Sequence, residues 1–335
     1  MTARVYFLDV GQGDGTVVVV ESLDKPKQAI IIDCAYAPTA IEALEDEGVE
    51  AIPLIVITHG DRDHCDGLIP LVNRYFGKIG TIAINYDKAR QLITKDSVYR
   101  SLISSLLDAY DEGAFGALAP ASSVEGCDWP WEATLPVELE VLYPQQNDLG
   151  RALLDEDANL ASCIVRMSHR DVRFILGADL PSKGWLQLRD RGVDLSAEVL
   201  RFPHHGGSLF GEMQLEELLQ LVTPTVVVFS VGTPNPHGHP TAEVMATVRS
   251  IGARIVCTQV TPRCHDQIAA DREGIIATFP PTMKIGRSSS FASQCPCAGS
   301  IRVEIDDEGW RVLPEAKVHS SVIGKFATPL CRTAT

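Results

Sequence analysis

Short apolar runs bounded by glycine or charged residues fill the first part of the chain. Four of them have the length and β-branched content of buried strands: VYFLDV (5–10), TVVVVES (16–22), AIIIDC (29–34) and LIVITH (54–59). Between the third and the fourth, PTAIEALEDEG (38–48) begins with proline and ends with glycine, which is typical of a helix. The N-terminal part is therefore predicted to be strand-rich, with a first helix before the fourth strand.

The pattern then changes. GLIPLVNRYFG (67–77) is predicted to be a helix and GTIAIN (80–85) a strand, whereas residues 87–111 look helical and residues 112–136 look loop-like. We interpret residues 87–136 as an insertion between two halves of one domain that spans residues 1–335.

The second half repeats the mixed pattern. We expect strands near 138–143, 160–168, 171–178, 197–202, 225–231, 254–258 and 300–305, and helices near 182–191, 212–221 and 241–251. Two halves of this kind predict an α/β fold in which two sheets pack face to face with helices outside, a four-layer αββα sandwich. The domain would end in a cysteine-containing segment, about 257–335.

Composition adds limits. The chain has 335 residues, of which 45% are hydrophobic and 22% charged, enough for a large core. No apolar run approaches the roughly 18–20 residues of a membrane span, and MTARVYFLDV does not look like a signal peptide. We therefore expect a cytoplasmic protein without a membrane partner; the sequence names no protein partner.

The net charge of −15 disfavours long tracts of nucleic acid, because an acidic surface repels phosphate backbones. It leaves room for chemistry on a phosphodiester, since bound metal ions reverse the local field. The nine cysteines, an odd number without a visible signal peptide, indicate reduced thiols or metal ligands instead of a disulfide framework.

The richest motif is His59-x-Asp61-x-Asp63-His64, directly after the apolar run LIVIT. Residues two apart on an extended chain point the same way, so His59 and Asp61 could share one ion. Asp63 and His64, at the turn into the next helix, could face a second ion roughly 3.5–4 Å away. The alternative is an exposed polar turn, but its position after a buried strand favours a metal site.

Other strand ends supply further ligand-type residues. VRFILGADL ends in Asp179, VLRFPHHGG carries a histidine pair, and PNPHGHP carries two more histidines. Any one alone would be an ordinary loop residue, whereas four strand ends together predict a shared centre. The four histidines of the last two segments are His204, His205, His237 and His239.

The order FLDVGQGDG, IIIDCA, THGDRDHCDG, ILGADL, PHHGG and GHP resembles the metallo-β-lactamase superfamily. More narrowly, it is similar to the soluble hydrolase domain of ComEC-type DNA-uptake proteins, over about residues 4–310. The resemblance implies a hydrolase with two divalent metal ions. It also implies that the bond hydrolysed is a phosphodiester, because related domains are thought to degrade DNA.

The resemblance assigns roles to individual positions. Asp63 would also orient the attacking water, and His239 or the histidine of the 204/205 pair that is not a ligand would protonate the leaving oxygen. The implied metal ligands are His59, Asp61, Asp63, His64, Asp179 and one of His204 and His205. The residues expected to support the ligands or to line the substrate floor are Asp9, Gln12, Asp14 and Asp33, with His237 beside His239.

Two positions depart from the wider superfamily. Asp61 stands where relatives carry histidine, and a further histidine is expected before the bridging Asp179. His169 is too far along its hairpin, because ten residues at about 3.3 Å each span about 25–30 Å. Pairing the strands around that turn brings Asn159 or Leu160 opposite Asp179, and Asn159 is expected to take the place of the missing histidine. More oxygen ligands make manganese or magnesium plausible beside zinc.

Cysteines near the C-terminus raise a separate question. Cys264, His265, Cys295 and Cys297 would form an additional structural zinc site if their strands are neighbours. The spacing Cys-x-Cys is tighter than the usual Cys-x-x-Cys, so unpaired thiols are the favoured interpretation. Cys65, inside the main motif, is expected to pack in the core.

Basic and aromatic residues of the insertion have two interpretations. Lys88, Arg90, Lys95 and Arg100 either line the cleft or form a solvated helix face. Trp129 and Trp131 either stack on a base or anchor a loop.

Three functions remain open. The leading one is a nuclease or phosphodiesterase acting on short or single-stranded nucleic acid with zinc or manganese. A second is hydrolysis of a small molecule, namely a phosphorylcholine ester, thioester or lactam. A third is a non-catalytic partner module, which the retained carboxylates argue against because buried unpaired charge is costly.

Overall fold

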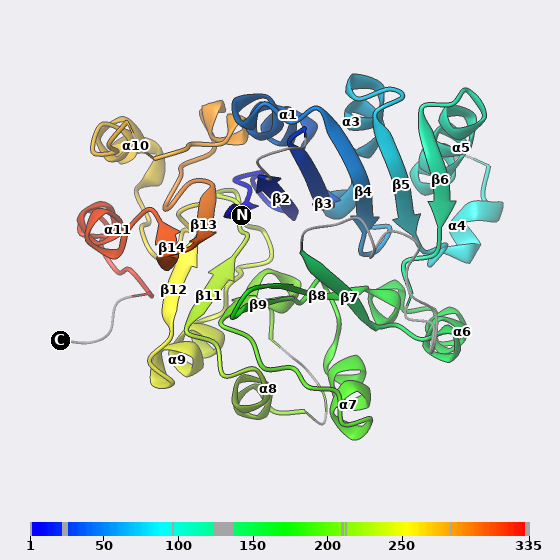
Figure 1. Cartoon of the computed structure of the whole chain (residues 1–335). Helices are drawn as coiled ribbons and strands as arrows, with labels where there is room; N and C mark the ends of the chain where they lie inside the picture. The colour runs from blue at the N-terminus through cyan, green and yellow to red at the C-terminus, as the bar shows by residue number, and fades with distance from the viewer. Residues whose placement is uncertain are drawn as a thin grey trace.

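The computed structural model describes residues 2–21, 26–95, 97–122, 137–208, 211, 213–281 and 283–331. Its strands form an eight-stranded and a six-stranded sheet within these residues. The two sheets lie against each other, with α1, α3 and α5 outside one and α7, α8 and α9 outside the other (Figure 1). The predicted four-layer αββα sandwich is confirmed.

The first sheet has the strand order β14-β13-β1-β2-β3-β4-β5-β6. Its antiparallel half joins β14, β13, β1, β2 and β3, whereas β3, β4, β5 and β6 run parallel. The bounds are β1 Thr2–Phe7, β2 Gly15–Glu21, β3 Gln28–Cys34, β4 Ala51–Ile57, β5 Ile79–Ile84, β6 Phe115–Ala119, β13 Ile301–Asp306 and β14 Gly309–Leu313.

The second sheet has the order β12-β11-β10-β9-β8-β7, with β7, β8 and β9 antiparallel and β9 to β12 parallel. Its bounds are β7 Glu138–Tyr143, β8 Ile164–His169, β9 Val172–Leu176, β10 Val199–Arg201, β11 Val226–Phe229 and β12 Arg254–Cys257. Because parallel strands end at one edge, the loops after β4, β9, β10 and β11 can supply one site.

The helices follow the strands they cover. Their bounds are α1 Ala37–Glu47, α2 Arg62–Cys65, α3 Leu68–Arg74, α4 Ala89–Ile93, α5 Val98–Asp111, α6 Gln146–Asp155, α7 Ser182–Asp190, α8 Leu215–Val222, α9 Ala242–Ser250, α10 Ile268–Ile276 and α11 Ala316–Ile323. No helix in the described part of the chain is both long and apolar enough to cross a membrane.

Successive side chains of each strand point to opposite faces of its sheet, which divides the core into three layers. On β4, Leu54 and Val56 pack between the two sheets, whereas Ile55 and Ile57 pack under the helices of the first sheet. Both faces of this strand are therefore covered, which explains why its sequence is continuously apolar.

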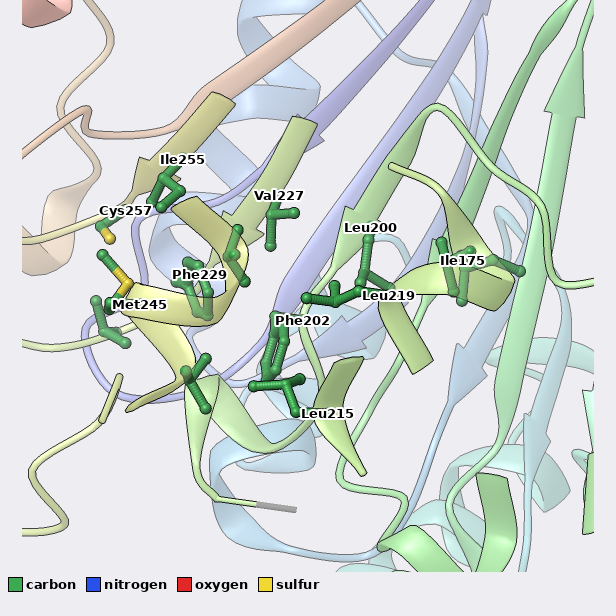
Figure 2. Close-up of a cluster of buried hydrophobic side chains, with 14 of the residues drawn as sticks. Ile175, Leu200, Phe202, Leu215, Leu219, Val227, Phe229, Met245, Ile255 and Cys257 are labelled. Atoms are coloured by element: carbon green, nitrogen blue, oxygen red, sulfur yellow. The ribbon is translucent and has the colours of Figure 1, made fainter. Parts of the chain in front are cut away.

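The helices of the second sheet cover a separate apolar layer (Figure 2). Leu215 and Leu219 of α8 and Met245 of α9 belong to the same buried cluster as Phe202 and Phe229. The rings of Phe202 and Phe229 stack with centroids 5.0 Å apart. This layer fixes the chain on either side of the PHHGG segment.

The sequence reading missed several elements. Residues 115–119, predicted to be loop, form edge strand β6, and α6, α10, β14 and α11 were not predicted. These elements are short or, like α10, lack a clear apolar face, so periodicity gives little signal. Trp129 and Trp131 lie outside the described residues.

Candidate metal centre

The loop after β4 is held from two sides. The Gly60 N–H donates to Asp87 Oδ2 at 2.7 Å, and the Asp14 N–H donates to the Asp63 carbonyl at 2.8 Å. Gly13 has a φ of 130°, and a Cβ there would lie 2.4 Å from the Asp63 oxygen. Glycine therefore lets the GQGD loop lie directly on the His-x-Asp-x-Asp-His motif.

Four buried side chains direct ligand atoms without a hydrogen-bond partner toward one another. His59 Nε2, His64 Nε2, His205 Nε2 and Asp179 Oδ1 have no hydrogen-bond partner among the described residues. Asp179 Oδ1 lies 3.4 Å from His64 Nε2 and 3.7 Å from His205 Nε2. Asp179 Oδ2 lies 3.8 Å from His59 Nε2. Asp179 thus reaches all three histidines.

Two carboxylates complete the arrangement on its outer side. Asp61 Oδ2 lies 3.4 Å from His59 Nε2, and Asp63 Oδ2 lies 3.4 Å from His205 Nε2. Their side chains are 37% and 36% exposed, whereas that of Asp179 is 6% exposed. The centre is therefore open to solvent at Asp61 and Asp63.

These atoms fit divalent metal ions. The ligand atoms of His59, His64 and Asp179 lie within 4.8 Å of one another, and so do those of Asp63, His64 and His205. Buried polar atoms without a partner are costly, and imidazole nitrogens with carboxylate oxygens are ordinary ligands of zinc and manganese. The donor set therefore fits one or two divalent ions, with Asp179 reaching both groups.

The structure separates the two adjacent histidines. His205 is buried, and its Nδ1 lies 3.0 Å from the Ser230 carbonyl, which can only accept a hydrogen bond. Nδ1 therefore carries the proton and Nε2 is left as a ligand atom. His204 instead faces His239, with ring centroids 5.4 Å apart. Both residues have a φ of 52°, a left-handed conformation uncommon for residues other than glycine.

A layer of buried charge lies behind His64. Its Nδ1 is 2.9 Å from Asp33 Oδ2, and the Thr58 hydroxyl donates to the same carboxylate oxygen at 2.9 Å. Arg201, from β10, lies 2.9 Å from Asp14 Oδ2 and 3.2 Å from Asp33 Oδ2. The predicted support residues Asp14 and Asp33 are thus beside the centre. The sequence reading missed Arg201.

The buried carboxylates and imidazoles of the centre shift one another's pKa values, because each favours the charged form of the other. For Asp179, burial alone would raise the pKa, but His205 and His64 together hold the pKa well below its usual range. Burial lowers the pKa of His205, yet Asp179 and Asp14 raise it to a net value of about 9. Without metal, protons on His64 and His205 balance the carboxylates, because the pKa of each of these two rings is raised. An ion at the centre would displace those protons.

Asp9 differs from the expectation. Its carboxylate is fully buried and accepts hydrogen bonds from Gln259 Nε2 at 2.6 Å and from the Ser289 hydroxyl at 2.5 Å. Asp9 thus anchors the segment around residue 288 and does not face the ligand atoms. Gln12 Oε1 accepts from the Gly232 N–H at 3.4 Å and links its loop to the one after β11.

The residue opposite Asp179 also differs. Val165 pairs with Leu176 and His169 with Val172, so the hairpin turn is Arg170–Asp171. Continuing this register three residues beyond the Val165–Leu176 pair places Ser162, not Asn159, opposite Asp179. Asn159 lies in a 3-10 turn, 158–161. The error arose from placing the turn about one residue too early. The Ser162 hydroxyl is buried without a partner among the described residues.

The loop after β11 brings a further histidine toward the PHHGG segment. His239 lies over Gly207, where a Cβ would be 2.9 Å from the His239 Cε1 atom. Burial, then the neighbouring His204, lowers the pKa of His239 to about 4, so its ring is neutral at pH 7. Its predicted role as proton donor stays a prediction. His237 is exposed, with its ring centroid 5.8 Å from that of His239.

Lys88 borders the outer side of the centre. Its ammonium pairs with Asp61 and lies 5.8 Å from the Tyr99 ring centroid. The Tyr99 hydroxyl donates to Asp87 Oδ1 at 2.8 Å. A pocket of about 500 Å³ extends from Asp61 past Lys88 to α5. Lys88 therefore lines a cavity beside the centre, whereas Arg100 is exposed and bonds the Leu92 carbonyl.

The predicted structural zinc set is not assembled. His265 Nε2 lies 2.9 Å from Asp271 Oδ2, and its Nδ1 accepts from the Ala327 N–H. Both ring nitrogens of His265 are thus engaged away from the thiols. The Cys295 sulfur lies 3.9 Å from the Pro296 carbonyl.

Comparisons with known proteins agree with this geometry. Residues 10–136 match the model of the metallo-beta-lactamase superfamily. The chain is 28% identical over 261 residues to competence protein ComA of Neisseria gonorrhoeae, covering 77% of this chain and 31% of that protein. It is 22% identical over 243 residues to ComE operon protein 3 of Bacillus subtilis strain 168, covering 72% and 28%. The chain thus spans about a third of these relatives' length.

Among solved structures, zinc-bound PqqB from Methylobacterium extorquens matches with a TM-score of 0.43 and 12% identity, covering 77% of this chain and 98% of that chain. The order of the motifs, the two stacked sheets and the superfamily match over residues 10–136 lead to one assignment. Within residues 10–136 the chain matches the metallo-beta-lactamase superfamily, and the chain as a whole is similar to part of two competence proteins.

Proposed function

We propose that this chain is a metal-dependent hydrolase that cleaves a phosphodiester, with short or single-stranded nucleic acid as its substrate class. One observation carries the proposal: the open atoms of His59, His64, His205 and Asp179 converge, with Asp61 and Asp63 beside them. Histidine and carboxylate donors without thiolates suit zinc or manganese.

The residues of the candidate metal centre would have three different roles: metal ligand, general base and positioning residue. His59, His64, His205, Asp61, Asp63 and Asp179 would hold two divalent ions, which when bound supply Lewis acidity toward water and phosphoryl oxygen. Asp63, which is more exposed than Asp179, orients the attacking water and accepts its proton. Asp33 and Ser230 fix the ring orientations of His64 and His205 through their Nδ1 atoms.

The substrate side has cationic and N–H groups. Lys88 and Arg62 line the pocket beside Asp61 and offset the acidic surface for an anionic substrate. His239, neutral at pH 7, can donate an N–H hydrogen bond toward the leaving oxygen from the opposite loop. A pocket of about 500 Å³ has room for a nucleotide but not for a long duplex.

The test uses metal-stripped protein supplied with zinc or with manganese. Substrates are bis-nitrophenyl phosphate, single- and double-stranded DNA and RNA, a phosphorylcholine ester, a lactam and a thioester. We expect turnover of the phosphodiester and of single-stranded nucleic acid, abolished by Asp63→Asn. The matched control is Asp46→Asn, an exposed carboxylate on α1 that pairs with Lys284. Turnover of only the lactam or the thioester, or no loss in Asp63→Asn, contradicts the proposal.

A further inference from the structure

Four cysteines from separate segments gather at the end of β12. Cys257 is the last residue of β12, Cys264 lies before α10, Cys297 precedes β13, and Cys331 follows α11. Cys257 and Cys297 are 6% and 5% exposed. Cys264 and Cys331 are partly buried and pack against the same apolar cluster. None of the four forms a disulfide bond in this structure.

Backbone hydrogen bonds bring the first two thiols together. The Ala298 N–H donates to the Cys257 carbonyl at 3.0 Å, and the Cys297 N–H donates to the Thr258 carbonyl at 2.9 Å. The segments that carry Cys257 and Cys297 therefore run side by side. This differs from the set suggested by the sequence, because Cys257 replaces Cys295 as the neighbour of Cys297.

The other two thiols come from the loop before α10 and from the C-terminal segment. The Thr328 N–H donates to the Cys264 carbonyl at 2.9 Å, which fixes the chain three residues before Cys331. Arg249 of α9 donates to the Leu330 carbonyl at 3.1 Å. Cys331 is thereby held between α9 and the loop of Cys264.

The thiols influence one another electrostatically, as near neighbours must. Burial raises the pKa of the Cys297 thiol well above its usual value, and Cys331, Cys257 and Cys264 raise the pKa further. Burial likewise raises the pKa of Cys257, with Cys331 and Cys264 adding to the rise. Burial thus keeps the Cys257 and Cys297 thiols neutral unless a cation compensates their charge.

A buried histidine touches this group. His319 of α11 is 4% exposed, and its Nε2 lies 3.2 Å from the Cys297 sulfur. Burial lowers the pKa of His319 to about 4, so the ring is neutral and can donate one N–H to sulfur. Hydrogen bonds of this kind stabilise metal-bound thiolates.

We propose that Cys257, Cys264, Cys297 and Cys331 form a structural zinc site, with the His319 ring hydrogen-bonded to the Cys297 sulfur. Four thiolates are the ligand set that closed tetrahedral zinc sites use. Among the described residues, the sulfur atoms of these cysteines do not lie within 4.8 Å of one another, as the ligand atoms of the candidate metal centre do. Binding would require the four sulfurs to lie closer together than they do in this structure. Zinc replaces the four thiol protons, which pass to solvent.

Such a site would act on the fold at a distance. Gln259, two residues after Cys257, bonds Asp9 at 2.6 Å, and Asp9 begins the loop that lies on the His-x-Asp-x-Asp-His motif. The ion would thus hold the segment before β13, the segment after α11 and the loop after β12 in a single arrangement.

The test is cobalt substitution of the full chain, read by absorption. Thiolate-to-cobalt charge transfer arises only from sulfur ligands, so the candidate metal centre, whose donors are nitrogen and oxygen, does not contribute. We expect this absorption in the wild type, and about one zinc equivalent less per chain in Cys264→Ser and in Cys331→Ser. Both cysteines are partly exposed, so serine is tolerated at either position.

Two control variants test the ligand set. Cys295→Ser and Cys163→Ser, which alter thiols outside the group, should keep the absorption and the zinc content. Asp63→Ala, at the candidate metal centre, should also keep the charge-transfer absorption. The proposal is overturned if the wild type lacks this absorption, if Cys264→Ser and Cys331→Ser keep it, or if mass spectrometry finds a disulfide between two of the four cysteines.

Discussion

His64 Nδ1 lies 2.9 Å from Asp33 Oδ2, and both side chains are fully buried between the two sheets. The carboxylate also accepts from the Thr58 N–H at 2.8 Å and from the Thr58 hydroxyl at 2.9 Å. One nitrogen of the ring is therefore committed to Asp33, which leaves Nε2 directed at Asp179. This relationship sets the orientation of a predicted ligand without touching the ion itself.

Replacing Asp33 by asparagine should weaken metal binding by about 10–100-fold while preserving the fold. The amide keeps the size of the side chain and tolerates the φ of 61° at this position, but it loses the charge that orients His64. Competition with a chelator measures the affinity. Asp46→Asn should leave the affinity unchanged, and an unaltered affinity in Asp33→Asn would refute this role.

Arg201 should be the most costly single ion-pair residue to remove. It is 1% exposed and lies 2.9 Å from Asp14 Oδ2 and 3.2 Å from Asp33 Oδ2. Arg201→Met leaves two buried carboxylates without their cation, so the free energy of unfolding should fall by about 3–5 kcal/mol. Urea denaturation measures this change. Arg311→Met, which removes an exposed pair with Glu304, should cost about 0–1 kcal/mol. Equal losses in the two variants would contradict the prediction.

Gly207→Ala tests the placement of His239. A Cβ at residue 207 would lie 2.9 Å from His239 Cε1 and 3.0 Å from Nε2, so the imidazole must shift. We expect kcat on the phosphodiester to fall by about 10-fold or more, with zinc content unchanged.

The matched control for that substitution is Gly150→Ala within α6. No atom lies within 4 Å of a Cβ at this position among the described residues. Alanine should stabilise the helix by about 0.5–1 kcal/mol and should not change kcat on the phosphodiester. Unchanged kcat in Gly207→Ala would show that His239 does not act in catalysis.

Glu47 should give the protein a pH-dependent stability outside the metal centre. Burial would raise the pKa of Glu47, but hydrogen bonds from Tyr6 and from Arg4, the latter at 2.7 Å, lower the pKa below 4.5. A lowered folded-state pKa stabilises the fold above the unfolded-state value, and this contribution is lost as the pH falls through the folded-state value.

The measurement compares wild type with Glu47→Gln. At pH 7 the variant should be less stable by about 1.5–3 kcal/mol, the range for hydrogen bonds to charged groups. The difference should shrink once the pH drops below about 4.5. Glu45→Gln, in an exposed pair with Arg74, should differ from wild type by at most about 1 kcal/mol. A difference in the free energy of unfolding that is the same at pH 3 as at pH 7 would exclude this cause.

The sequence predicted the elements around the centre well. Strands such as β4 are apolar on both faces and end in ligand-type residues, so their position and their role as carriers of the site follow from local pattern. Short edge elements such as β6 gave no comparable signal. Their structure depends on pairing with residues distant in the sequence.

The details of the site depended on register and on packing between sheets. The hairpin turn at Arg170–Asp171 places Ser162 opposite Asp179, and a displacement of one residue in the turn had suggested Asn159. Arg201 could not be identified from the sequence, because its partners Asp14 and Asp33 come from the other sheet. The choice of His205 over His204 required the left-handed backbone of both residues.

The candidate ligands come from both halves of the sandwich. His59, Asp61, Asp63 and His64 follow β4 of the first sheet, whereas Asp179 and His205 follow β9 and β10 of the second. Bound ions would therefore link the two sheets, in addition to their apolar contacts, the Arg201 pairs and hydrogen bonds such as that of Gln259 to Asp9. Removing the ions should increase local opening between the two sheets. Amide hydrogen exchange should therefore accelerate along the facing strands before the molecule unfolds.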